Sequence, residues 1–122
     1  LHGAATPGQL CAQWFPTATG LISLSTHPEG RPQVMLEAMA AGLPILASRL
    51  PAHVDLIEHG KTGWICDDRQ SMAAGLASIE TAQVGMTMGQ HARATAQSRF
   101  GTWDDCAARY GALYAALMQA VR

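Results

Sequence analysis

Residues 28–44 read PEGRPQVMLEAMAAGLP, a loop rich in glycine and proline followed by an apolar, helix-like segment. We expect the helix to cover residues 32–41, because it would begin with proline and be followed by glycine. The segment carries two carboxylates eight residues apart, Glu29 in the loop and Glu37 on the helix. A ligand lying along it would therefore meet a carboxylate, the first helical amides and a second carboxylate in turn.

The start of this helix is suited to an anion. The main-chain amides of Arg31, Gln33 and Val34 point toward the loop without helical partners, and the helix dipole adds partial positive charge there. Pro32 has no amide hydrogen to contribute. The side chain of Arg31 would either add a full charge or point to solvent. A diphosphate is the natural occupant of such a position.

The two carboxylates suit hydroxyl groups. Glu37 lies about 7.5 Å beyond Pro32 along the helix axis, and a carboxylate accepts two hydrogen bonds side by side, as a ribose diol would donate them. Glu29 could accept hydroxyls of a hexose, and Gly30 would let a sugar ring approach the backbone closely. The alternative is that Glu37 is an ordinary solvated residue. Its apolar neighbours favour the functional interpretation, because a glutamate on a largely buried helix needs a reason to be there.

The rest of the chain alternates apolar runs with helical patterns. Short apolar runs bounded by Gly, Pro or polar residues predict strands over residues 21–25, 44–48 and 63–66. Helical patterns cover residues 7–15, 32–41, 52–58, 69–80 and 86–98, and a long terminal helix carries Cys106, Tyr110, Leu113, Leu117 and Val121 on one face. This order predicts an open α/β sheet of short parallel strands flanked by helices. Ligands in such sheets bind beyond the carboxyl ends of the strands, where the Glu29 loop begins.

The composition is that of a globular domain. Of the 122 residues 48% are hydrophobic and 14% are charged, and the net charge is −1. These values argue against disorder and against a dedicated nucleic-acid-binding protein. No apolar run is long enough to span a bilayer. Cys11, Cys66 and Cys106 form no disulfide framework or zinc-site spacing, so we expect free and mostly buried thiols.

Several polar and aromatic residues are given structural interpretations. His53 and His59 flank a short helix and match no metal-ligand spacing, and the pair at residues 67–68, Asp-Asp, is expected in a surface turn. We therefore predict no metal site and no cofactor. His27 is expected in a turn rather than in the site, and Trp64 in the core.

Residues 29–44 resemble the signature of retaining group 1 (family 4) GT-B glycosyltransferases, in which seven residues separate two glutamates. The similarity continues through residues 46–48, 55–64 and 67–68, and downstream through residues 88–93 and 99–103. Upstream, His2-Gly3 resembles the end of the preceding strand, where members of the family seat the base. The resemblance implies that residues 1–122 form part of the C-terminal, donor-binding domain of such an enzyme, with a Rossmann-like fold.

The resemblance also implies roles for individual residues. Glu29 would act at the catalytic centre by holding hydroxyls of the donor sugar, and Glu37 would bind the ribose. The backbone of Gly30, Arg31, Pro32, Gln33 and Val34 would contact sugar and diphosphate, and Gly3 would lie near the base. Arg31 stands where many members have an aromatic residue, which leaves the choice of donor open. The family transfers its sugar with retention at the anomeric carbon and without a metal bound by an Asp-x-Asp motif.

Further expectations concern the protein beyond this chain. Three strands are too few for a complete fold of this kind. We therefore expect the acceptor domain and the first strands of the donor domain, with their basic pair for the diphosphate, outside residues 1–122. The chain alone would bind a UDP- or GDP-sugar without turning it over. We expect a cytoplasmic protein; contact with the inner face of a membrane and a homodimer of the chain remain open. The alternatives are a nucleotide-sugar epimerase or hydrolase of GT-B shape, and a non-catalytic nucleotide-sugar-binding module.

Overall fold

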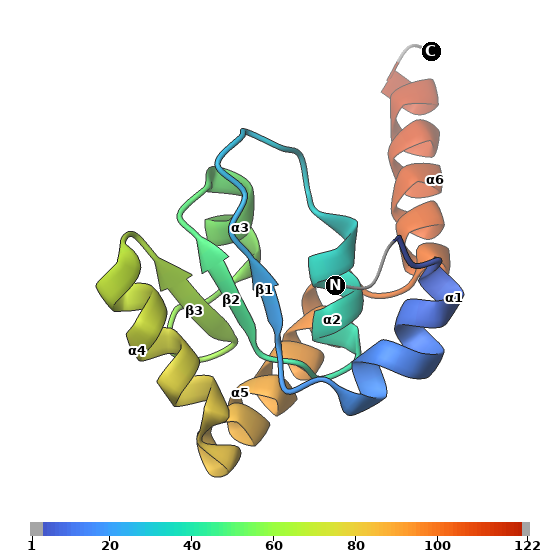
Figure 1. Ribbon diagram of the computed structural model, residues 1–122. Coiled ribbons are helices and arrows are strands. Elements are labelled where there is room, and N and C mark those ends of the chain that lie inside the picture. Colours follow the sequence, from blue (N-terminus) through green and yellow to red (C-terminus); the bar gives the residue numbers. More distant parts are fainter. Residues whose placement is uncertain (1–3, 121–122) are drawn as a thin grey trace.

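The computed structural model describes residues 4–120, in which three short parallel strands lie side by side in the order β1-β2-β3 (Figure 1). The strands are β1 (Leu21–Ser23), β2 (Ile45–Ser48) and β3 (Gly63–Cys66). Ile45 of the central strand pairs with Leu21 on one side and Gly63 on the other. This confirms the predicted parallel α/β arrangement. The first strand ends at Ser23, earlier than predicted.

Helices connect and cover the strands. They are α1 (Pro7–Gln9) with the short turns η1 (Leu10–Trp14) and η2 (Phe15–Thr17), α2 (Gln33–Ala40), α3 (Pro51–Leu56), α4 (Arg69–Glu80), α5 (Ala82–Thr95) with the π-helical turn η3 (Ala96–Phe100), and α6 (Trp103–Ala120). Each predicted helical segment is therefore helical. In α2 and α5 the start differs from the predicted one, and in both cases a proline or a glycine near the start explains the difference.

Two such boundaries correct the predictions. Pro32 is not the first helical residue: its backbone is extended, with ψ 113°, and its carbonyl accepts a hydrogen bond from the amide of Met35. The proline ring fixes φ but leaves ψ free, so Pro32 can close the loop instead of opening the helix. α5 begins at Ala82 rather than at residue 86. Gly85 does not interrupt this helix; its missing side chain instead lets the helix lie close to the carbonyl of Ile79.

The central strand β2 is covered on both faces and is the most buried strand of the sheet. Successive residues of β2 enter different clusters, because side chains alternate along a strand. Ile45 belongs to the cluster that includes Met35 and Met39 of α2, whereas Leu46 belongs to the one that includes Ile79 of α4. This two-sided packing holds α2, and with it the predicted motif, against the centre of the sheet.

The cysteines are less buried than predicted. Cys66 is buried and Cys106 half-buried, but Cys11 is exposed, so the expectation of mostly buried thiols is wrong for Cys11. The N-terminal helical segment sends Phe15 into the core instead. Burial raises the pKa of the Cys66 thiol, which keeps it protonated at neutral pH.

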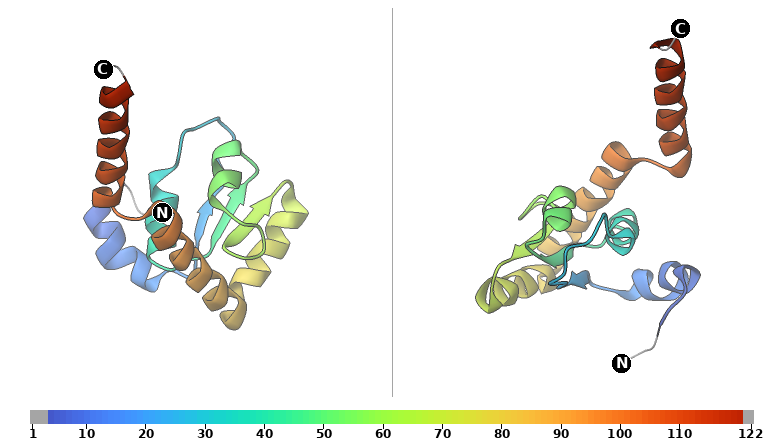
Figure 2. Two further views of the ribbon diagram at one scale, coloured as in Figure 1. Left: turned by 180° about the vertical axis from the view of Figure 1, so that it is seen from behind. Right: turned by 90° about the horizontal axis from the view of Figure 1, so that it is seen from above.

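Two apolar surfaces have no covering element among residues 4–120. α6 projects from the body of the molecule, and none of its residues is buried (Figures 1 and 2). The predicted apolar face of this helix is open, with Leu113 54% and Leu117 53% exposed. Ile22 on the edge strand β1 is likewise 55% exposed. Within the described part of the chain, no helix combines the length and the apolar character needed to cross a membrane.

Candidate functional site

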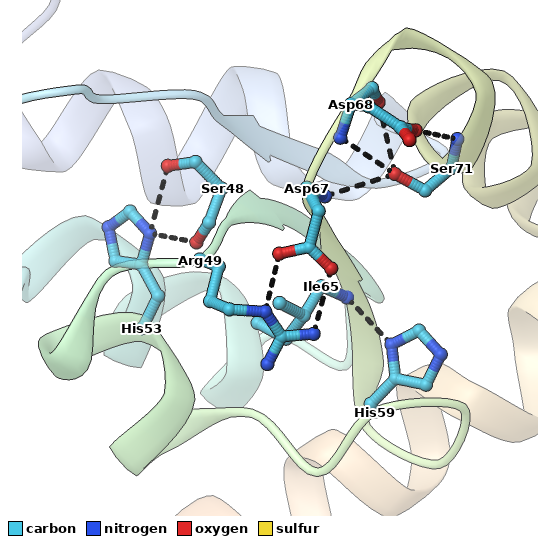
Figure 3. Close-up of polar contacts among 8 residues, drawn as sticks. All are labelled: Ser48, Arg49, His53, His59, Ile65, Asp67, Asp68 and Ser71. Carbon is cyan, nitrogen blue, oxygen red and sulfur yellow. Dashed lines mark hydrogen bonds and ion pairs between the residues drawn. The ribbon is translucent and has the colours of Figure 1, made fainter.

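The predicted motif lies at the carboxyl edge of the sheet. The loop of residues 24–32 leaves the end of β1 and leads into α2 (Figure 1). Ser48 ends β2, Asp67 follows β3, and Arg49 connects the two by donating to the Asp67 carboxylate (Figure 3). Parallel α/β sheets bind ligands at this edge. The topology thus places the Glu29 loop where a ligand site is expected.

Glu37 faces a broad hollow between α2 and the start of α6. The hollow has a volume of ≈ 840 Å³, and Arg31 and Gln33 of the same motif also line it. Glu37 is half-buried, and no residue in the described range 4–120 forms a hydrogen bond or ion pair with its carboxylate. A partly buried carboxylate without a partner costs free energy that a donor group would recover. This side chain is therefore free to accept hydrogen bonds from a ligand.

The opening of α2 presents main-chain amides beside Glu37. The helix begins at Gln33, so the amides of Gln33 and Val34 belong to its first turn and have no carbonyl four residues back within the helix. Met35 already donates to the carbonyl of Pro32 at 3.2 Å. An anion at this helix end would therefore bind chiefly to the first two amides, with the helix dipole adding to the attraction.

Arg31 is exposed, but its guanidinium already has partners within the protein. Its guanidinium lies 3.3 Å from a carboxylate oxygen of Asp55 and 5.2 Å from the ring centroid of Phe100. Arg99 pairs with the other oxygen of Asp55 at 3.2 Å and lies over the same ring. Exposed ion pairs such as these stabilise a fold only slightly. Because Asp55 would keep Arg99, Arg31 could leave this cluster at low cost.

Glu29 is turned away from the hollow that Glu37 faces. Its Oε1 lies 2.9 Å from Nε2 of His53, which is completely buried on α3. Gly30 has open space around it and no left-handed backbone, so the fold itself does not require glycine there. Gly3 lies outside the described residues. The structure thus brings Arg31, Gln33 and Glu37 to one hollow and places Glu29 at another contact.

Sequence reasoning missed His53. The absence of a metal-ligand spacing says nothing about contacts with a distant loop. The useful signal is that His53 lies three residues before Leu56, on the side of α3 that enters the core. A histidine on a buried helix face needs partners for both ring nitrogens.

The other polar residues have structural partners, as predicted for them. The amide of His27 donates to the hydroxyl of Ser25, which is consistent with a turn. His59 accepts the amide of Ile65 at 3.0 Å (Figure 3). Asp67 pairs with Arg49, which lowers the pKa of Asp67. Within residues 4–120, no group of three or more His, Cys, Asp or Glu side chains is arranged to hold a metal ion.

Asp68 caps the start of α4, and this contact should make the stability of the domain depend on acid pH. The Ser71 amide donates to the Asp68 carboxylate at 2.7 Å and lowers the pKa of that group (Figure 3). The folded state then binds a proton less readily than the unfolded state, whose aspartates titrate near pH ~3.9. The stabilisation is fully present above that value and is lost as the pH falls through the folded pKa.

Asp68→Asn, which keeps a capping oxygen but does not titrate, should therefore lose less stability than the unchanged chain between pH 5 and pH 3. Urea midpoints measured across this range test the expectation. Parallel curves for the two proteins would contradict it.

Together, the fold and the site define a class. A parallel sheet flanked by helices, whose carboxyl edge carries a helix start and two separated carboxylates, is an open α/β domain of the kind that binds ligands at that edge. The chain belongs to the family of group 1 glycosyl transferases, whose family model matches residues 15–98. The matched region includes the complete motif from Glu29 to Pro44.

Individual relatives agree with this assignment. The chain is 34% identical over 110 residues to D-inositol 3-phosphate glycosyltransferase of Streptomyces scabiei, covering 88% of this chain and 24% of the relative. It is 30% identical over 83 residues to N-acetyl-alpha-D-glucosaminyl L-malate synthase of Bacillus anthracis, covering 66% and 22%. The chain thus spans about a quarter of the length of these relatives.

Solved structures show the same fold. Sucrose-phosphate synthase from Thermosynechococcus elongatus is similar over 81% of this chain and 26% of its own, with a TM-score of 0.70 and 26% identity. HepE of Anabaena in complex with UDP-glucose is similar over 66% of this chain and 23% of its own, with a TM-score of 0.56 and 32% identity.

Proposed function

We propose that this chain is the donor-binding part of a retaining glycosyltransferase that moves a hexose from a nucleotide sugar to an acceptor. The observation that carries the proposal is the half-buried carboxylate of Glu37, which has no partner among residues 4–120 and faces a hollow beside the start of α2. Membership of the group 1 family supports it. The UDP-glucose complex of HepE supports a uridine donor, and a guanosine donor is the alternative.

Each part of the motif has a role in this proposal. The ribose diol donates two hydrogen bonds to Glu37, and the diphosphate accepts from the amides of Gln33 and Val34. Glu29 accepts a hydrogen bond from a hydroxyl of the donor sugar and is the residue of this site that lies at the catalytic centre. Arg31 approaches the diphosphate once it leaves Asp55. No metal is needed for these contacts, because amides and an arginine supply the positive charge.

The chain binds the donor but does not complete the reaction by itself in this proposal. Further strands would pair with the edge of β1 that is free within residues 4–120, and the exposed Ile22 and the open apolar face of α6 are surfaces on which other parts of the protein would pack. The small share of each relative that this chain covers supports this view. Stabilisation of the departing diphosphate then depends partly on groups outside residues 1–122.

Ligand-observed NMR on the chain tests donor binding. Saturation-transfer spectra would be recorded with UDP, GDP and ADP, and with UDP-glucose, GDP-mannose and ADP-glucose, because the method detects millimolar affinity. Saturation of ribose and base protons for one nucleotide is the expected result, and it would name the base. If no nucleotide or nucleotide sugar is saturated, the chain has no donor site, and the proposal fails for it. Binding by the full-length protein without any transfer would favour a non-catalytic module.

Gly30→Ala separates a role in sugar binding from a role in folding. An alanine Cβ at this position would have no atom within 4 Å, and the backbone there is not left-handed. We therefore expect an unchanged urea midpoint. Because the donor sugar is proposed to approach Gly30 closely, we expect weaker saturation of the sugar protons of UDP-glucose with unchanged saturation of its base. Equal saturation of both by the variant would contradict a close approach.

A further inference from the structure

His53 links the loop that carries Glu29 to the end of the central strand. Its ring is 0% exposed and lies on α3, within hydrogen-bond distance of both segments. Nδ1 lies 2.9 Å from the carbonyl oxygen and 3.4 Å from the hydroxyl oxygen of Ser48 (Figure 3). On the opposite side of the ring, Nε2 lies 2.9 Å from Oε1 of Glu29. A buried imidazole thus bridges the two parts of the site edge.

The partners of Ser48 determine which nitrogen carries a hydrogen. The Ser48 hydroxyl donates to the carbonyl of Ser25 at 2.6 Å, so its oxygen can only accept from His53. The Ser48 carbonyl is also an acceptor. Both contacts of Nδ1 therefore require an N–H on that nitrogen. With a single ring proton placed there, Nε2 has a lone pair.

A lone pair on Nε2 would face the Glu29 carboxylate at 2.9 Å without a hydrogen between them. Two acceptors at this distance repel, and His53 is shielded from water. A proton must therefore lie between Nε2 and Oε1, carried either by the ring, as in an ion pair, or by the carboxyl group. In both cases Oε1 of Glu29 is occupied by His53, and Oε2 is the oxygen left for a ligand.

We propose that His53 is a positioning residue, which holds Glu29 by this shared proton and directs Oε2 toward a hydroxyl of the donor sugar. The inference rests on the function proposed above. The loop needs such a support, because residues 26–31 are all exposed and make few contacts with the body. Besides the contact between Glu29 and His53, the loop is held by the hydrogen bond from the Ser48 hydroxyl to the Ser25 carbonyl and by the contacts of Arg31 with Asp55 and Phe100.

The contact itself is tested by NMR of the ring nitrogens in the 122-residue chain. In the unchanged protein, Nδ1 of His53 should carry a hydrogen, and Nε2 should share one with Glu29. In Glu29→Gln the side-chain amide can donate to Nε2, so Nε2 should give the resonance of an unprotonated nitrogen while Nδ1 keeps its hydrogen. If this resonance has moved relative to the unchanged protein, the ring carries the shared proton there; if it has not moved, the carboxyl group carries it. A ring protonated only at Nε2 in the unchanged protein, or an Nε2 that still carries a hydrogen in Glu29→Gln, would overturn the inference.

A matched pair of variants tests the positioning. In His53→Gln the terminal amide reaches the place of Nε2 and can still donate to Glu29, whereas in His53→Asn it reaches the place of Nδ1 and can donate only to Ser48. The readout is the ratio of the affinity for UDP-glucose to the affinity for UDP. We expect this ratio to be kept in His53→Gln and to fall about tenfold in His53→Asn, the effect of one hydrogen bond to a charged group.

The outcome that would contradict the role of His53 differs from the one that would contradict the proposed function. Equal ratios in both variants would mean that His53 has only a structural role, and this would leave the proposed function intact. Failure of the unchanged chain to bind any nucleotide or nucleotide sugar of the panel would contradict the proposed function itself. Affinity for UDP alone serves as the internal control, because the uridine and diphosphate contacts do not involve Glu29.

Discussion

The Gly89→Ala variant is expected to be less stable than the unchanged chain by about 3 kcal/mol, a large share of the stability of a small domain. Gly89 lies on α5 where this helix meets the turn after α2. An added Cβ would overlap the carbonyl oxygen of Gly42 and come within 3.0 Å of its carbonyl carbon. Gly42 cannot easily give way, because it holds a left-handed φ of 80° in the short turn between α2 and the buried strand β2.

Urea unfolding followed by circular dichroism measures this loss as a lower midpoint at an unchanged slope. Gly111→Ala on α6 is the matched control, because a Cβ there would have no atom within 4 Å. It should be neutral or slightly stabilising, since alanine favours a helix over glycine by up to ~1 kcal/mol. Equal midpoints for Gly89→Ala and the unchanged chain would show that α5 does not pack on α2 as described.

Glu37→Ala is expected to weaken nucleotide binding about a hundredfold, since it removes two hydrogen bonds between the ribose diol and a carboxylate. In saturation-transfer spectra at millimolar ligand, the ribose signals of the bound nucleotide should disappear. The fold should be unaffected or slightly more stable. This is because Glu37 has no partner among the described residues and its half-buried charge costs free energy.

Two further variants make this result specific. Glu37→Gln keeps one accepting oxygen but loses the charge, so its loss should be about tenfold. Glu80→Ala removes an exposed glutamate at the end of α4, far along the chain from the motif, and should leave binding unchanged. Undiminished ribose saturation in Glu37→Ala would remove this residue from the site and with it the observation that carries the proposed function.

Much of the fold followed from local patterns. The apolar runs at β2 and β3 and the helical periodicity of α2 and α4 lie where they were predicted, because each depends on residues a few positions apart. The motif from Glu29 to Glu37 also lies at the carboxyl edge of the sheet, as predicted. Its position follows from a strand, a loop and a helix that are consecutive in the chain.

Other features could not be predicted from neighbouring residues. The apolar face of α6 is typical of a packed helix, yet no residue of this helix is buried within residues 4–120. Periodicity indicates that a face could be covered, not that a covering element is present. In the same way, the sequence does not decide whether the Arg31 side chain meets a ligand or solvent, and the structure places it against Asp55 and Phe100.

The sequence by itself thus determined the fold class, the family and the two carboxylates of the motif, because these depend on short-range order along the chain. Only the tertiary structure decided how those carboxylates differ. Glu37 has no partner among residues 4–120, whereas Glu29 meets His53 across 24 positions of sequence. That contact exists because α3 holds the buried ring of His53 between the Ser48 carbonyl at the end of β2 and the Glu29 side chain of the loop. No local pattern encodes the direction in which a loop closes over a sheet.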